Sequence, residues 1–214
     1  MYRLFYYPGN ANLAPHVLLE EASAPYELVL VDREKGGQKD ADYLRLNPNG
    51  RIPTLVDGEL VLFEAAAICL HIADRHPEAE LSPPQGSPDR SHFYKWLIFL
   101  TNTIQPDYMA FRYPENYTAD PSGIAAVRHQ AERRLAVGFA VLDGALDDSP
   151  YLVGRRYSAC DAYLFMLCTW ARRLPNPPSD LPRLRRVLDA VAVRPAVERA
   201  YSAEGLDSRA YATP

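Results

Sequence analysis

The stretch over residues 47–65 constrains the fold more than any other part of the chain. Its residues predict a turn, a strand, a tight turn, a second strand and a helix start in immediate succession. Asp57-Gly58 separates two apolar runs and favours a hairpin, because both central positions of such a turn need a positive φ. Pro53 stands where the first strand should begin, a position that tolerates a residue without an amide hydrogen. The stretch therefore predicts two adjacent antiparallel strands followed by a helix.

The residues before this hairpin carry the pattern of a strand–helix–strand unit. Apolar and aromatic runs predict strands, and apolar positions at helical spacing predict helices, which gives elements over residues 3–7 (strand), 13–22 (helix), 26–31 (strand), 40–46 (short helix) and 64–75 (helix). The strands of such a unit run parallel, with a right-handed crossover. The nearly continuous apolar run over residues 26–31 indicates a strand covered on both faces. The order β-α-β-α-β-β-α is that of a thioredoxin-like domain.

A segment rich in proline, glycine and serine divides the chain. Residues 82–88 read Ser-Pro-Pro-Gln-Gly-Ser-Pro, a composition that suits neither a helix nor a strand. The expected fold class is therefore α/β plus all-α. We expect a thioredoxin-like domain over residues 1–77, a linker over 78–88 and an α-helical bundle over 89–214.

Helical spacing of apolar residues continues through the second half. The predicted helices cover residues 92–103, 122–146, 160–173, 181–193 and 195–201. The helix over residues 160–173 is apolar nearly all round, which indicates the buried centre of the second domain. Pro106, Pro114 and Pro121 predict an irregular segment between the first two of these helices.

Composition and charge argue against several classes of protein. Of the 214 residues, 48% are hydrophobic and 23% are charged, as in an ordinary globular protein. The net charge of −4 argues weakly against a nucleic-acid partner or an anionic membrane surface. No run approaches 18 uninterrupted apolar residues, and the N-terminus has no basic segment like that of a secretion signal. We expect a soluble cytoplasmic protein.

The cysteines and histidines give no indication of a metal site. Cys69, Cys160 and Cys168 all fall within apolar helical patterns, which predicts buried, reduced thiols. The five histidines show no spacing typical of zinc ligands. We therefore expect no metal cofactor.

Ser158 and Asp161 stand three residues apart directly before an apolar run, which predicts a capping box. In this arrangement the Ser158 side chain accepts from the Asp161 N–H, while the Asp161 side chain accepts from the Ser158 N–H. We expect a structural role for the pair, with Asp161→Ala costing about 1 kcal/mol or more.

Three stretches, residues 8–22, 47–74 and 151–165, resemble the soluble glutathione transferases. The middle stretch reads N-P-N-G-R-I-P-T-L-V-D-G and then L-F-E-A-A-A-I-C-L-H-I-A. The resemblance implies glutathione as co-substrate, a homodimer, and a cis peptide before Pro53. It also implies that the backbone of Ile52 takes up the cysteinyl part of glutathione like an added strand. Lys39 and Arg51 are expected to contact glutathione as well.

The resemblance assigns the γ-glutamyl end of glutathione to Glu64 and Ala65, at the start of a helix. Free backbone N–H groups there would receive a carboxylate. The family has serine at the position of Ala65, so one hydrogen bond is missing and we expect binding weaker by about 1 kcal/mol.

The loop that follows the first strand departs from the family patterns. It resembles the bacterial motif P-G-A-C-S-L-A-P-H, but the cysteine position is Ala11 and the serine position is Asn12. An asparagine amide can donate a hydrogen bond to a thiolate without acting as a base. The catalytic candidates are therefore Asn10 first, Asn12 second and Tyr6 third. Asn12 directly precedes a helix, so it is equally well interpreted as a helix cap.

Aromatic residues in the second half predict a site for a small hydrophobic electrophile. Such side chains give flat apolar walls, although core packing explains them equally well. The expected pocket residues are Tyr108, Phe111, Arg112, Tyr113 and Trp170.

The sequence leaves three functions open. The first is conjugation of the glutathione thiolate to an electrophile. The second is a glutathione-dependent isomerase or dehalogenase on the same fold. The third is a non-catalytic glutathione-binding module, which the lack of a thiol or hydroxyl at positions 10–12 favours.

Overall fold

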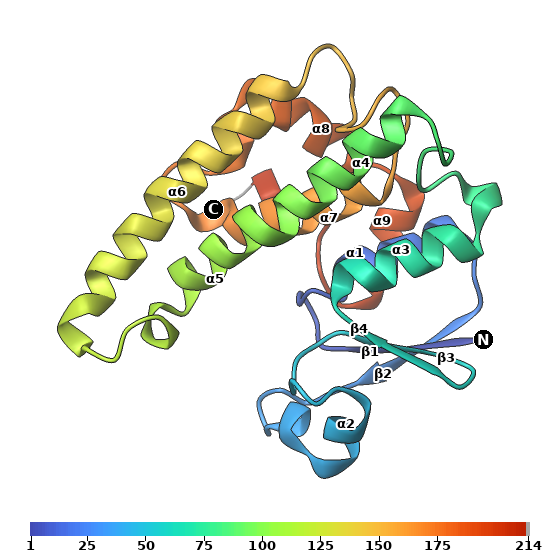
Figure 1. Ribbon diagram of the computed structural model, residues 1–214, viewed down its shortest axis with the longest axis horizontal. Helices are drawn as coiled ribbons and strands as arrows, with labels where there is room; N and C mark the ends of the chain where they lie inside the picture. The colour runs from blue at the N-terminus through green and yellow to red at the C-terminus, as the bar shows by residue number, and fades with distance from the viewer. Residues whose placement is uncertain (213–214) are drawn as a thin grey trace.

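The computed structural model describes residues 1–212. Within this range, the N-terminal half holds a four-stranded sheet in the order β2-β1-β3-β4 (Figure 1). The strands are β1 (Tyr2–Tyr6), β2 (Tyr26–Leu30), β3 (Thr54–Asp57) and β4 (Leu60–Phe63). β1 pairs with β2 in parallel and with β3 antiparallel, which confirms the predicted strand–helix–strand unit and hairpin.

Three helices accompany this sheet. They are α1 (Leu13–Glu21), α2 (Ala41–Leu46) and α3 (Ala65–Arg75), and α1 and α3 lie side by side on one face (Figure 1). Leu4 and Leu55 point toward these two helices and are fully buried. Phe5, which points the opposite way, has its ring 5.9 Å from that of Tyr43 on α2. The sheet is therefore covered fully on one side and only locally on the other.

Two details of the sheet differ from the prediction. β2 is an edge strand, and Leu30 is 58% exposed, so this strand is not covered on both faces. The apolar run over residues 26–31 led to the wrong prediction because helices cover only one face of the sheet at this edge. In the hairpin, Asp57 pairs with Leu60, so the central turn residues are Gly58 and Glu59. Only Gly58 has a positive φ, of 61°, as in a type II′ turn.

The C-terminal half is mostly helical, as predicted. Its α-helices are α4 (Pro88–Phe99), α5 (Gln105–Arg112), α6 (Ile124–Ala145), α7 (Ala159–Trp170), α8 (Pro182–Ala192) and α9 (Pro195–Ala203). A π-helical turn over Leu100–Ile104 joins α4 to α5 in one continuous rod (Figure 1). Pro106 follows this π-helical turn and leaves the rod unbroken, so the chain is not irregular at this proline. Two short 3₁₀ turns do follow, at Pro114–Asn116 and Pro121–Gly123.

Helix α7 is the buried centre of the C-terminal half, as its apolar pattern predicts. All its residues from Ala159 to Thr169 are buried. The capping box is also confirmed, since Ser158 and Asp161 exchange both side-chain-to-backbone bonds. The two halves share one continuous core, because α1 packs against both α7 and α9.

All three cysteines are buried, as predicted, and carry no disulfide. Burial raises the pKa of the Cys69, Cys160 and Cys168 thiols well above the usual range. Among residues 1–212, no group of His, Cys, Asp and Glu side chains could hold a metal ion. The helices described in that range are also too short or too polar to cross a membrane.

Candidate active site

A cleft of about 700 Å³ lies between the thioredoxin-like half and helices α5 and α7. On the first side it is lined by loop residues that follow β1, follow β2 or precede β3: Gly9, Asn10, Ala11, Arg33, Gln38, Lys39, Asn49, Gly50, Arg51 and Ile52. On the second side it is lined by residues near α5 and at the end of α7: Gln105, Tyr108, Met109, Arg112, Tyr113, Asn116 and Trp170.

This cleft gathers most of the residues that the sequence proposes for function. Those that line it are Asn10, Lys39, Arg51, Ile52, Tyr108, Arg112, Tyr113 and Trp170. Those placed outside its lining are Tyr6, Asn12, Pro53, Glu64, Ala65 and Phe111. A larger hollow of about 800 Å³ beside the linker contains none of the proposed residues.

The loop between β1 and α1 separates the two asparagines into different environments. Asn12 is completely buried; its Oδ1 accepts from the Tyr7 N–H at 3.2 Å and its Nδ2 donates to Glu204 at 2.7 Å. Both ends of this amide are therefore engaged inside the protein. Asn10 faces the cleft, with its Oδ1 accepting from Arg33 at 2.5 Å. Its Nδ2 makes a long bond of 3.3 Å to the Pro8 carbonyl.

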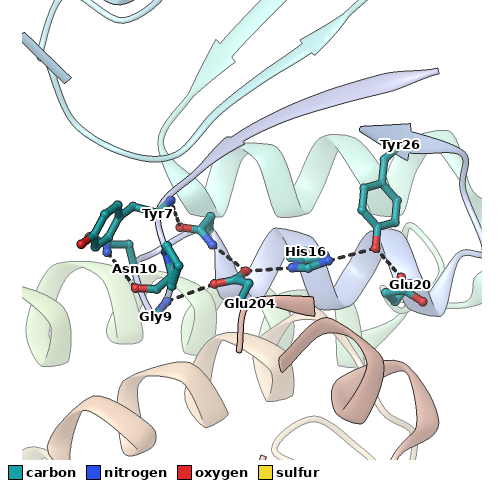
Figure 2. A network of polar contacts seen from close by, with 9 residues as sticks. Tyr7, Gly9, Asn10, His16, Glu20, Tyr26 and Glu204 are labelled. Carbon is teal, nitrogen blue, oxygen red and sulfur yellow. Dashed lines mark hydrogen bonds and ion pairs between the residues drawn. The ribbon is translucent and has the colours of Figure 1, made fainter. Parts of the chain in front are cut away.

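Glu204, just beyond α9, holds this loop from the opposite half of the chain (Figure 2). One carboxyl oxygen accepts from the Gly9 N–H at 3.0 Å. The other accepts from the Asn12 amide and lies 2.8 Å from Nδ1 of the buried His16. A single side chain thus fixes the backbone at Gly9 and the start of α1.

The network continues from His16 to the surface (Figure 2). His16 Nε2 lies 2.9 Å from the Tyr26 hydroxyl, which donates to Glu20. Burial, together with the hydrogen bond to Glu20, raises the pKa of Tyr26, so this hydroxyl keeps its proton. The last contact in this series is the ion pair of Glu20 with Arg199 on α9, in which Nε and Oε2 lie 2.6 Å apart. The connected groups tie α1 to α9.

A second contact from the helical half reaches the same loop. The indole Nε1 of Trp170 donates to the Gly9 carbonyl at 2.8 Å. Gly9 has a φ of 73°, a conformation that glycine adopts without strain. Both polar groups of the Gly9 backbone are therefore bonded to side chains from the C-terminal half.

Ile52, shortly before β3, lines the cleft. The Ile52–Pro53 peptide is cis, as the resemblance implies, and Ile52 is half-buried. The preceding turn is fixed because the Arg51 carbonyl accepts from Tyr43 at 2.6 Å and from Asn47 at 2.8 Å. The turn before β3 is thus held in place by Tyr43 and Asn47, which lie outside the cleft lining.

Lys39 packs closely on this turn. Gly50 has a φ of 57°, and a Cβ atom there would lie only 2.8 Å from Lys39 Nζ and from the Gln38 carbonyl oxygen. Glycine at position 50 therefore lets the ammonium group of Lys39 approach the backbone. Lys39 forms no ion pair within residues 1–212.

Glu64 and Ala65 occupy the start of α3, as the resemblance implies. Glu64 has a φ of 70°, which is uncommon for a residue with a side chain, and its carbonyl accepts the first helical bond from Ile68 at 3.0 Å. The N–H groups of the first turn have no partners within the helix, as at every helix N-terminus. These two residues stay candidates for binding a carboxylate.

Aromatic side chains form the opposite wall. The rings of Tyr108 and Trp170 lie 5.5 Å apart with their planes inclined by 31°. Phe111, outside the cleft lining, has its ring 6.5 Å from that of Tyr108. Arg112 lies over the Tyr113 ring at 4.8 Å. Both flat apolar surface and positive charge are present on this side.

Sequence patterns missed several residues of the site. Arg33, Gln105 and Asn116 line the cleft, yet each belongs to a segment without a motif. Glu204 contacts the loop from 192 residues along the chain, as its bond with Asn12 shows, and nothing in its neighbourhood indicates this. The signal that could have pointed to it is the buried, polar pair Asn12 and His16, which needs partners.

The arrangement defines a protein in which a thioredoxin-like domain and a helical domain both line one binding cleft. Family models agree with it: "Glutathione S-transferase, N-terminal domain" matches residues 1–74 and "Glutathione S-transferase, C-terminal domain" matches residues 108–195. The chain belongs to the glutathione S-transferase family.

Individual relatives cover nearly the whole chain. Glutathione S-transferase GstA of Escherichia coli O157:H7 is 33% identical over 95% of this chain and 99% of its own. The structure of a glutathione S-transferase from Xylella fastidiosa is 32% identical, with a TM-score of 0.87 over 96% of this chain and 100% of its own. A sphingomonad glutathione S-transferase complexed with glutathione is 32% identical, with a TM-score of 0.82 over 95% and 99%.

Proposed function

We propose that this protein conjugates the thiolate of glutathione to small hydrophobic electrophiles, in the cytoplasm and as a homodimer that serves detoxification. The observation that carries the proposal is the cleft itself. It sets Ile52, the Asn10 amide and three cations without an ion pair among residues 1–212 (Arg33, Lys39 and Arg51) across from an aromatic wall. One side suits a peptide-like thiol, and the other suits an apolar acceptor.

Glutathione would bind along the first side. The backbone N–H and C=O groups of Ile52 would pair with its cysteinyl residue as with an added strand. Lys39 and Arg51 would face its glycine carboxylate, and the start of α3 would receive its γ-glutamyl carboxylate. The thiol would then lie near the loop that carries Asn10. The sphingomonad relative, a complex with glutathione, supports this choice of ligand.

Asn10 is the best-placed group to stabilise the thiolate. Arg33 binds its amide oxygen, which polarises the amide and strengthens its N–H groups as donors. Its bond to the Pro8 carbonyl is long, and the amide nitrogen has a second hydrogen. Asn12 has both ends of its amide engaged and is a poorer candidate. The thiolate would attack the electrophilic carbon, forming a thioether as the leaving group departs with its electron pair.

The homodimer is supported by apolar side chains that this chain leaves exposed. Leu60 and Phe63 lie on the edge strand β4 and are 43% and 37% exposed. Tyr94 and Ile98 on α4 are 43% and 57% exposed. Apolar surface of this kind suits an interface with a second copy.

The pKa of the bound glutathione thiol is the direct test of this function. We expect binding to lower it by about two units from its ordinary value near 9, and Asn10→Ala to restore most of that shift. The measurement is the ultraviolet absorbance of the thiolate against pH, on both proteins saturated with glutathione. Asn116→Ala, a cleft amide outside the loop, is the control and should leave the shift intact.

Other outcomes of this measurement distinguish the alternatives. Binding with an unshifted thiol pKa would contradict the transferase and favour a non-catalytic module, which the lack of a thiol or hydroxyl at positions 10–12 also favours. A lowered pKa with glutathione regenerated after turnover would favour an isomerase.

Replacing Lys39 with glutamine should weaken glutathione binding by about 5- to 20-fold, because a charge-assisted hydrogen bond is lost. Isothermal titration calorimetry gives the dissociation constant. Lys35→Gln is a matched control from the same loop, since Lys35 is 85% exposed, pairs with Asp32 and lies outside the cleft. Equal losses in the two variants would point to general charge attraction and contradict a specific contact.

A further inference from the structure

The charges that line the cleft are unusually one-sided. Arg33, Lys39, Arg51 and Arg112 line it, and within residues 1–212 no aspartate or glutamate does. None of these four cations forms an ion pair in that part of the chain. The whole protein has 27 acidic and 23 basic residues, so the cleft is a positive region in an acidic molecule. Such a cleft concentrates anions.

Glutathione, bound as proposed, accounts for three of these cations and leaves one. Lys39 and Arg51 lie on the side of the glycine carboxylate, and Arg33 is bonded to Asn10 behind the thiol. Arg112 stands on the other wall, at the end of α5, beside Tyr108 and Tyr113. Its guanidinium group lies 4.8 Å from the centre of the Tyr113 ring, and both residues line the cleft.

Other polar groups accompany Arg112 at this end of the cleft. Burial raises the pKa of the Tyr108 hydroxyl, while the guanidinium groups of Arg112, Arg172 and Arg173 act in the opposite direction. Arg172 and Arg173 lie in the 3₁₀ turn Ala171–Arg173, which directly follows Trp170. The carboxamide of Asn116, which also lines this end of the cleft, adds a hydrogen-bond donor.

We infer that the second substrate is an aromatic or conjugated electrophile that carries a carboxylate, and that Arg112 binds this carboxylate. The inference rests on the proposed function and narrows its substrate class. The flat part of the electrophile would lie against Tyr108 and Trp170, whose rings form one apolar wall. The anionic group would face Arg112, leaving the reactive carbon toward the Asn10 loop.

A pair of benzyl halides tests this inference. The probes are 4-(bromomethyl)benzoate and its methyl ester, which share the reacting carbon and differ mainly in charge. The glutathione sulfur forms a bond to the benzylic carbon, bromide leaves with the electron pair, and the thiol proton passes to solvent. Each kcat/KM is divided by the uncatalysed rate with glutathione, so that intrinsic reactivity cancels.

We expect wild type to prefer the carboxylate over the ester by at least 5-fold, with less preference at high salt. Arg112→Gln should lower kcat/KM for the carboxylate about 10-fold and for the ester less than 2-fold, with an unchanged KM for glutathione. Arg128→Gln is the control, because Arg128 is exposed on α6 and lies outside the cleft. Equal preference in wild type, or equal losses for both probes in Arg112→Gln, would overturn the inference.

Binding of the two thioether products separates this inference from the proposed function. Calorimetry with S-(4-carboxybenzyl)glutathione and its methyl ester should show the acid binding at least 5-fold more tightly, and Arg112→Gln should remove the difference. If neither halide is turned over but this difference holds, the transferase is wrong and the carboxylate site stands. Turnover of both halides with equal product affinities would overturn the carboxylate site alone. Failure of both products to bind would overturn both.

Discussion

Replacing Glu204 with alanine is expected to lower the free energy of unfolding by about 3–5 kcal/mol and to disable the proposed glutathione site at the same time. The side chain is fully buried and receives hydrogen bonds from the Gly9 N–H and the Asn12 amide, with His16 Nδ1 2.8 Å away. Alanine would leave these groups buried without a partner. The loop that carries Asn10 would lose its anchor at Gly9.

Urea denaturation measures the stability loss, and calorimetry on the folded fraction measures glutathione binding. Glu198→Ala is the matched control on α9, because its carboxylate is 49% exposed and its ion pair with Arg209 spans 3.8 Å; we expect less than about 1 kcal/mol there. Glu204→Gln should fold better than the alanine variant but still bind glutathione less tightly, since its amide NH₂ would face one of the present donors. Normal glutathione affinity in both Glu204 variants would contradict a role in holding the loop.

Replacing Asp161 with alanine is expected to cost about 2–4 kcal/mol, more than an ordinary helix cap. Its side chain accepts from the Leu152 N–H at 2.7 Å and from the N–H and hydroxyl of Ser158 at 2.8 Å and 3.0 Å. The bond to Leu152 is the reason for the larger figure, because it ties the preceding loop to the start of α7. Two buried N–H groups would lose their acceptor.

The measurement is again urea denaturation, at pH 7.5. Burial raises the pKa of Asp161 to about 6, so the carboxylate is mostly ionised at this pH and can accept from all three donors. Asp42→Ala provides the control, since this side chain is 89% exposed and pairs only with Arg45 among residues 1–212. A stability loss below 1 kcal/mol for Asp161→Ala, or equal losses in the two variants, would show that the buried hydrogen bonds contribute little.

The order of strands and helices could be predicted because it follows from local patterns. Asp57-Gly58 and the apolar runs beside it place the hairpin, and the unbroken apolar character of residues 160–170 places α7 at the centre. The same patterns did not show that β2 lies at an edge. An apolar run predicts a strand but does not say whether helices cover one of its faces or both. Pro106 was misleading because the helical path continues through it, and no local pattern announces the π-helical turn just before it.

The candidate site was less accessible to sequence reasoning. Asn10 and Asn12 have the same side chain and stand two residues apart, and only the position of Glu204 gives them different environments. That position depends on how α9 packs against α1, which no local pattern specifies. Arg112 was predicted as a pocket residue, but its lack of a counter-charge emerges only when the whole cleft is assembled.

Because its cysteines are buried, the folded protein should be unreactive toward thiol reagents. Because Cys69, Cys160 and Cys168 are enclosed and their pKa values are raised, the folded chain presents no competing thiolate at neutral pH. In a mixture with glutathione, the thiols that react therefore belong to glutathione, free or bound. The rate with an alkylating dye, after subtraction of the rate for the same free glutathione without protein, reports the reactivity of the bound sulfur with no need to mutate the protein first.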